Sequence, residues 1–152
     1  MINITSLIED RVFGGIQQAG AHGQRSQRSG PITALEVTQL ISKGIDGAVL
    51  QRISKRIPRA VLAETLGTDV SNFAKLYHRT LTKPQTDEIN DLTLLWSELR
   101  EFFEDDRELM DEWLNAAVPA LSDAQPWDLL STFTGRQAVR TALDAMRYGD
   151  FS

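Results

Sequence analysis

The sequence contains no cysteine and only two histidines among its 152 residues. The absence of cysteine excludes disulfides, thiolate zinc sites and thiol nucleophiles, and it suits the cytoplasmic location that we expect. No apolar run is longer than four residues, so we expect no membrane-spanning segment. The segment from Met1 to Leu7 lacks the basic start and apolar core of a signal peptide, and we therefore expect no export signal.

Sequence signatures of an enzyme are also missing. There is no GxxxxGK[ST] or GxGxxG loop, and neither His22 nor His78 has a second ligand or a carboxylate at the spacing of a metal or catalytic site. Paired carboxylates occur only within an acidic run, where no apolar pocket is implied that would raise a pKa. We therefore predict a protein that is not an enzyme, with no catalytic residue, no metal site and no cofactor.

The sequence does contain charge, and the charge is unevenly distributed. Residues 51–83 carry seven Lys or Arg against two acids, whereas residues 84–128 carry thirteen acids against two Arg. The formal net charge of −5 hides this asymmetry. One region can therefore approach phosphates while another repels them.

Breaker residues and helix signals divide the chain. Residues 1–30 are expected to form a flexible N-terminal extension, in which the first apolar patch is a strand or a turn of helix and Gly14 to Gly30 is a linker or a mobile arm. Thr33-x-x-Glu36 predicts a capping box at the start of the next helix, and Gly44 its end. No strand-like alternation follows residue 31, so the sequence predicts an all-α fold.

The segment from Ile57 to Leu81 has the pattern of a helix-turn-helix. The small Ala63 permits a close helix crossing, Gly67 provides the tight turn, and Phe73 packs the second helix onto the first. The second helix would then expose side chains that can contact base edges and phosphates. With Arg59, the predicted DNA-binding residues are Ser71, Asn72, Lys75, His78 and Arg79. A plain helical hairpin that does not bind DNA is the alternative. Because one recognition helix contacts few bases, we expect a homodimer.

The acidic middle segment has the period of an amphipathic helix. Its apolar positions are Leu92, Leu95, Trp96, Leu99, Phe102 and Phe103, and its acids are Asp91, Glu98, Glu101 and Glu104, followed by Asp105, Asp106, Glu108, Asp111 and Glu112. We interpret these acids as a solvated helix face together with the N-terminal acids of the next helix. A docking surface for a basic partner is the alternative.

The region from Trp113 to Gly149 has the order of a helix, a loop, a short helix, a glycine turn and a last helix. The first of these helices carries an apolar stripe of Leu109, Met110, Trp113 and Leu114, and Pro119 ends it. Pro126 opens the short helix, and Gly135 is expected to form the turn before the last helix.

The ordered set of these parts resembles the toxin-binding domain of Xre/MbcA/ParS-type antitoxins. The resemblance is carried by Trp113-Leu114, Ala120-Leu121, Pro126 with Leu129-Leu130, Gly135, Val139, Leu143 and Gly149. The helix-turn-helix residues are similar to those of Xre-type antitoxins, so the resemblance extends over residues 31–152. The sequence departs from the family pattern at Ala117-Val118, where Pro-Asn is common, and at Ser122-Asp123, which replace a glycine-containing turn.

The resemblance implies an Xre-like helix-turn-helix bundle that binds DNA over residues 31–90, followed by a linking helix and a toxin-binding domain over residues 91–152. It implies an antitoxin of a type II toxin–antitoxin system that covers the active site of a RES-domain, NAD+-consuming toxin and represses its own operon at operator DNA. By position, toxin binding falls on Arg140, Asp144, Arg147, Tyr148, Gly149, Asp150, Phe151 and Ser152. For Tyr148 and Phe151 the alternative is that they cover the core of their own domain. The alternative is a stand-alone helix-turn-helix transcription regulator whose C-terminal domain dimerises or senses a ligand.

Overall fold

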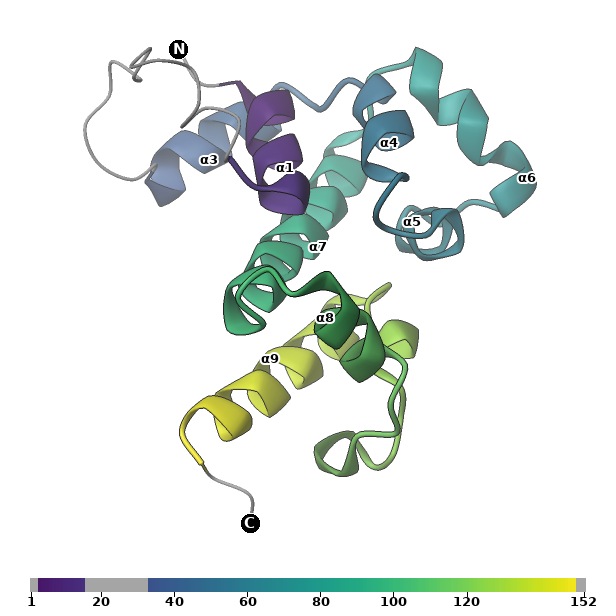
Figure 1. Ribbon diagram of the computed structural model, residues 1–152. Coiled ribbons are helices and arrows are strands. Elements are labelled where there is room, and N and C mark those ends of the chain that lie inside the picture. Colours follow the sequence, from purple (N-terminus) through teal and green to yellow (C-terminus); the bar gives the residue numbers. More distant parts are fainter. Residues whose placement is uncertain (1–2, 16–32, 150–152) are drawn as a thin grey trace. The chain divides into compact units, whose positions relative to one another are not determined.

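The computed structural model describes residues 3–15 and 33–149, and no strand occurs within these residues (Figure 1). The all-α fold expected from the sequence is therefore confirmed. The chain divides into two compact units that meet between Asn90 and Asp91, which we call unit 1 and unit 2. Unit 1 contains α1 (Ile4–Phe13), α3 (Ala34–Ser42), α4 (Ala48–Ile53), α5 (Arg59–Thr65), α6 (Val70–Phe73) and the 3-10 helix η1 (Ala74–His78). The helix α7 (Lys83–Phe102) begins in unit 1, and unit 2 adds α8 (Arg107–Leu114), η2 (Pro119–Leu121), η3 (Pro126–Leu129) and α9 (Phe133–Arg147).

The start of the expected flexible extension is a packed helix. Asn3 caps α1 by accepting a hydrogen bond from the Ser6 amide at 2.8 Å, and α1 packs against α4. Its inward positions Ile4, Ile8 and Val12 are buried. The expectation of flexibility is therefore wrong for these residues, because the apolar patch has the helical spacing that α4 can cover. The remainder of the expected arm, from residue 16, lies outside the described residues.

The helix caps of unit 1 follow the sequence. Thr33 accepts from the Glu36 amide while the Glu36 carboxylate accepts from the Thr33 amide, which completes the predicted capping box. Gly44 follows the C-cap of α3 with a φ of 80°. Both ends of α3 are thus set by local sequence.

Unit 1 is built around α4, whose inward residues have no exposed surface. The buried residues from this helix and its neighbours include Val49, Leu50, Ile53, Ile57, Leu62, Phe73 and Ile89. Gly47, just before α4, donates from its amide to the Arg79 carbonyl at 2.8 Å. A Cβ at Gly47 would lie 1.7 Å from the Leu76 carbonyl oxygen, so only glycine permits this approach between the start of α4 and η1.

Unit 2 has a core of aromatic and aliphatic side chains. The Trp96 and Trp127 rings lie 5.8 Å apart between centroids, and the Phe103 and Trp113 rings 5.7 Å apart. Burial of these rings supplies much of the hydrophobic stabilisation available to so small a unit. The aliphatic part of the core comes mainly from α7, α8 and α9: Leu92, Leu95, Leu99, Met110, Leu114, Val139, Ala142 and Leu143.

Gly135 does not form the turn that the sequence predicted. It lies in the first turn of α9, where its amide donates to the Thr132 hydroxyl, the N-cap, at 3.0 Å. A Cβ at this position would lie 2.1 Å from the Leu129 carbonyl oxygen. Glycine is therefore required by the close approach of η3 to α9, and the helix begins two residues before it.

Candidate functional site

The first candidate site is the exposed face of α6 and η1 in unit 1. α5 leads into Gly67, which has a φ of 72°, and α6 follows with Asp69 as its N-cap residue. Ala63 and Phe73 are buried where the two helices meet, as the sequence predicted. Helix, turn and helix thus occur in the expected order, although the second α-helix spans only Val70–Phe73 before it tightens into η1.

The predicted DNA-contacting residues all lie on the surface of unit 1. Ser71, Asn72, Lys75, His78 and Arg79 are exposed along α6, η1 and the residue that follows. Arg59 is exposed at the start of α5, and its guanidinium lies 5.6 Å from the centroid of the Phe73 ring. The face therefore brings the predicted residues of both helices onto neighbouring surface.

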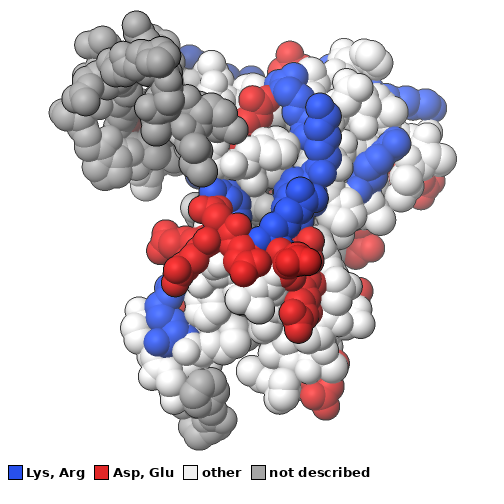
Figure 2. Space-filling model, in the orientation of Figure 1, with Lys and Arg blue, Asp and Glu red and all other residues white. Residues whose placement is uncertain are grey.

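A second group of basic residues adjoins this surface on α4 and the segment after it. Arg52 and Lys55 are exposed, and Arg52 forms a salt bridge with Glu9 of α1. Figure 2 shows a run of Lys and Arg side chains over this part of unit 1. Six of the seven Lys and Arg residues between positions 51 and 83 are exposed, so most of this positive charge faces solvent, where it can interact with phosphates.

In unit 2, α9 is tied to α7 by a buried arginine that the sequence analysis missed. The Arg136 side chain has no exposed surface, and its Nε donates to the Asp91 carboxylate at 2.6 Å. Its Nη1 donates to the Leu130 carbonyl at 2.9 Å. The only signal in the sequence is that Arg136 stands three residues before Val139, on the apolar side of the last helix. A charged side chain that points inward at such a position needs an oppositely charged partner.

Arg140, predicted to contact a toxin, continues this ion-pair cluster. Its Nη2 lies 3.0 Å from Asp91, and its Nε donates to Glu98 at 2.9 Å. Burial lowers the pKa of Arg140, but the hydrogen bonds to Glu98 and Asp91 outweigh it and the pKa is raised above its ordinary value. The interpretation of these acids as a solvated face therefore fails at Asp91, whose side chain is 21% exposed and bound by both Arg136 and Arg140, whereas Glu98 stays 42% exposed beside Arg140.

The other predicted toxin-binding residues of the described chain lie at the end of α9. Asp144, Arg147 and Tyr148 are exposed, and 76% of the Tyr148 surface is accessible. The Arg147 guanidinium lies 5.7 Å from the centroid of the Phe102 ring at the end of α7. Gly149 follows with a φ of 71°. Asp150, Phe151 and Ser152 lie outside the described residues.

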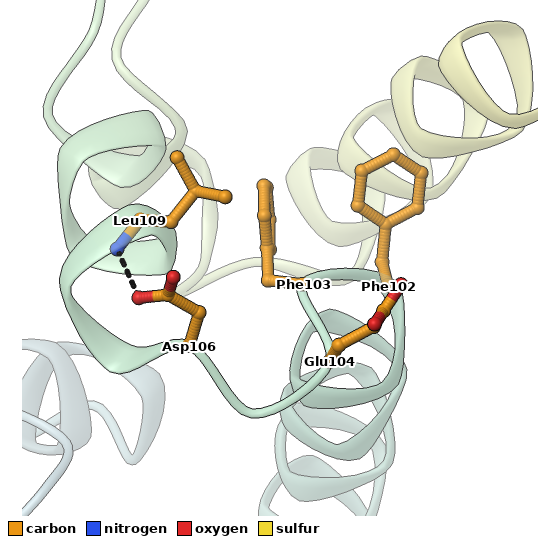
Figure 3. A pocket seen from close by; sticks show the side chains of 5 residues that line it. All are labelled: Phe102, Phe103, Glu104, Asp106 and Leu109. Atoms are coloured by element: carbon orange, nitrogen blue, oxygen red, sulfur yellow. Dashed lines mark hydrogen bonds between the residues drawn. The ribbon is translucent and has the colours of Figure 1, made fainter.

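A pocket of about 470 Å³ lies between the end of α7 and the first half of α8. Its walls are two phenylalanine rings, a leucine and two carboxylates: Phe102, Phe103, Leu109, Glu104 and Asp106. Figure 3 shows the Leu109 side chain directed toward Phe103, with Asp106 accepting a hydrogen bond from the Leu109 amide at 3.0 Å. The sequence placed Leu109 in the apolar core stripe of its helix, but 48% of it is exposed. The stripe is therefore narrower than predicted, and Leu109 belongs to the surface.

The turn that carries this pocket has an unusual backbone. Glu104 and Asp105 adopt φ values of 52° and 61°, a region that glycine and asparagine enter at lower cost. The Asp105 carboxylate lies 2.6 Å from the Arg100 guanidinium, which helps to hold the turn. Acidic side chains gather around this turn and α8 in Figure 2.

Residues 98–149 match one family model, the antitoxin Xre/MbcA/ParS C-terminal toxin-binding domain. The match begins within α7 and includes the pocket, α8 and α9, about a third of the chain. This finding supports an antitoxin role and a toxin partner. No curated protein and no solved structure matches the chain.

The described segments contain neither a metal-binding cluster nor a membrane-spanning helix. Within residues 3–15 and 33–149, no group of three or more His, Cys, Asp or Glu is arranged to hold a metal ion. No helix of the same segments has both the length and the apolar character needed to cross a bilayer.

Proposed function

We propose that this protein is the antitoxin of a type II toxin–antitoxin pair, that it is not an enzyme, and that its partner is a RES-domain toxin that consumes NAD+. The observation that carries the proposal is the family match over residues 98–149, which coincides with most of unit 2. The RES partner is the one implied by the resemblance of this region to Xre/MbcA/ParS-type antitoxins.

The toxin-binding surface in this proposal is the exposed end of α9. Tyr148 is the strongest anchor, because an exposed aromatic side chain buries a large area at a small entropic cost. Asp144 and Arg147 flank it with charges of both signs. Arg140 contributes indirectly, by holding α9 against α7 through Asp91 and Glu98.

Co-expression with the product of the adjacent reading frame tests this role. The wild-type chain should restore growth, co-purify with that product and stop its consumption of NAD+. Tyr148→Ala should weaken neutralisation, whereas Phe133→Ala should not, because Phe133 is also an exposed aromatic of α9 but lies at the other end of the helix. An adjacent product that is neither toxic nor bound would contradict the antitoxin role.

We propose that unit 1 binds operator DNA and represses the operon. The support is the exposed set on α6 and η1 together with the positive charge of residues 51–83. A recognition segment with one α-helical turn contacts few bases, so the active species is a homodimer on two half-sites about one turn of DNA apart.

Binding to a fragment of the promoter, measured over a range of salt concentrations, tests this second role. Lys75→Ala should lower the affinity and reduce the salt slope by about one unit. Asn72→Ala should lower the affinity for the operator more than for unrelated DNA, since Asn reads base edges. Lys43→Ala removes an exposed lysine of unit 1 that is not among the predicted contacts and should have little effect. Equal effects of Lys75→Ala and Lys43→Ala would place the DNA contact elsewhere.

A further inference from the structure

We propose that the pocket between α7 and α8 anchors a toxin segment in which a large apolar side chain stands next to a Lys or Arg. The inference rests on the antitoxin role proposed above and adds a second contact point to the exposed end of α9. The acidic middle segment has a docking surface for a basic partner as its alternative interpretation, and the pocket gives that surface a defined position.

The apolar half of the occupant follows from the walls of the pocket. Phe102 is half-buried, Leu109 is half-exposed, and the volume of about 470 Å³ can take a large side chain. Phe103 closes the floor and packs on Trp113 with centroids 5.7 Å apart, so the recess is held open by the core of unit 2 itself. A side chain inserted here would remove the exposed parts of Phe102 and Leu109 from water.

The charged half follows from the carboxylates at the same recess. Glu104 and Asp106 line the pocket, and residues 98–112 carry eight acids against two arginines. A neutral or acidic segment would have to desolvate these carboxylates without compensation, whereas a cation beside the apolar side chain would be attracted to them. The pocket therefore selects a basic partner segment.

The backbone at Glu104 supports a role for its side chain. At a φ of 52° glycine would be the conformationally cheaper residue, yet a carboxylate stands here and lines the pocket. Local strain of this kind often accompanies functional sites. The neighbouring Asp105 is explained by its salt bridge to Arg100, whereas Glu104 forms no ion pair among the described residues and belongs to the lining of the pocket.

The pocket is continuous with the proposed surface on α9. Phe102 contributes to the pocket, and the same ring is covered by the Arg147 guanidinium. Arg147 precedes Tyr148, the proposed aromatic anchor. One toxin can therefore contact the end of α9 and fill the recess at the same time, because a single ring joins the two surfaces.

Two matched leucines test the apolar contact. Leu109→Ser and Leu94→Ser remove the same side chain from exposed positions, 48% and 41% accessible, of α8 and α7, but only Leu109 lines the pocket. Affinity is measured by calorimetry on the full chain, with a catalytically inactive form of the adjacent gene product as the probe. We expect Leu109→Ser to weaken binding by about tenfold or more, and Leu94→Ser by less than about twofold.

A second pair of variants tests the charge. Glu104→Asn combined with Asp106→Asn removes both carboxylates while it retains a left-handed turn residue and an N-cap for α8. Asp123→Asn combined with Asp128→Asn removes two exposed carboxylates of unit 2 that lie outside the pocket and outside residues 98–112. The first double variant should lose about tenfold in affinity and part of the salt dependence, and the second should change neither by much.

The outcomes separate the two levels of the proposal. If the wild-type chain binds and neutralises the probe but each pocket variant equals its control, the pocket is not the anchor and the antitoxin role stands. If the wild-type chain does not bind the probe, the antitoxin role fails and the anchor fails with it. A Leu109→Ser chain that melts earlier than Leu94→Ser and binds weakly would not count as support, and the charge pair would then decide.

Discussion

The two units of this protein use different residues at the left-handed positions of their turns. In the described part of unit 1 these positions are occupied by glycines: Gly14, Gly44 and Gly67. In unit 2 they are occupied by Glu104, Asp105, Ser122 and Asp123, with Gly149 after α9. Glycine enters this region without a steric penalty, whereas each other residue costs on the order of 1 kcal/mol.

The difference shows what each set of turns does. At Gly67 the turn of unit 1 needs only the backbone conformation, since a Cβ there would meet nothing within 4 Å, whereas at Gly44 a Cβ would also lie 2.8 Å from the Thr80 side chain. The turns of unit 2 also position side chains, since Asp105 binds Arg100 and Glu104 lines the pocket. The conformational cost is thus concentrated in the unit that matches the toxin-binding family.

The largest expected effect is a loss of stability of unit 1 alone. Gly47→Ala should destabilise this unit by more than about 3 kcal/mol, because the new Cβ would lie 1.7 Å from a backbone oxygen. All three tryptophans of the chain lie in unit 2, so tryptophan fluorescence follows that unit while far-UV circular dichroism follows both. We expect an earlier transition in circular dichroism and an unchanged one in fluorescence.

Gly67→Ala is the control for this prediction. Gly67 has a positive φ but open space around its Cα, so the substitution should cost only about 1 kcal/mol. If Gly47→Ala shifts both signals together, the two units unfold as one.

The second largest expected effect is a loss of stability of unit 2. Arg136→Met leaves Asp91 without its closest cation and should destabilise the unit by about 3 kcal/mol, the lower end for a buried pair because Arg140 still reaches Asp91. Chemical denaturation followed by tryptophan fluorescence should show the loss. Asp91→Asn combined with Arg136→Met should recover part of it, since no uncompensated carboxylate remains. A double variant as unstable as the single one would mean that packing, and not charge, is lost.

The smallest effect tests the turn comparison directly. Asp123→Gly should stabilise unit 2 by about 1 kcal/mol, because φ is 66° at this residue. Gly44→Asp makes the opposite exchange in unit 1 and should destabilise it, both through φ and through a contact of 2.8 Å between the new Cβ and Thr80. The measurement is the melting temperature of each variant. A destabilising Asp123→Gly would show that the aspartate side chain does more for the turn than its backbone costs.

Much of the fold follows from local sequence. The capping box at Thr33, the end of α3 at Gly44, the turn at Gly67 and the buried stripe of α7 all depend on residues a few positions apart, and the sequence predicted each of them. The apolar patch of α1 is compatible with both a strand and a turn of helix, since so short a pattern fits both.

The features that the sequence did not predict depend on residues far apart in the chain. Arg136 can be buried because Asp91 of α7 pairs with it. The two residues are 45 positions apart in the sequence, so no local pattern contains the pairing. A glycine at position 135 predicts a turn, because the close approach of the Leu129 carbonyl cannot be recognised from the glycine alone. The sequence places Leu109 in the core because the helical period shows which side of a helix is apolar but not how much of that side is buried. The sequence does not predict the pocket either, because it places Leu109, one of the residues that line it, in the core.

The N-cap of α8 has a consequence for how pairs of this kind diverge. Asp106 both lines the recess and caps the helix, so it can be exchanged only for the few residues that cap equally well. Glu104 and Leu109 have no such second duty as helix caps and can change together with a partner. Under the proposed anchoring, duplicated copies of this gene would become insulated from each other's toxins by changes at these two positions, while the N-cap of α8 stays the same.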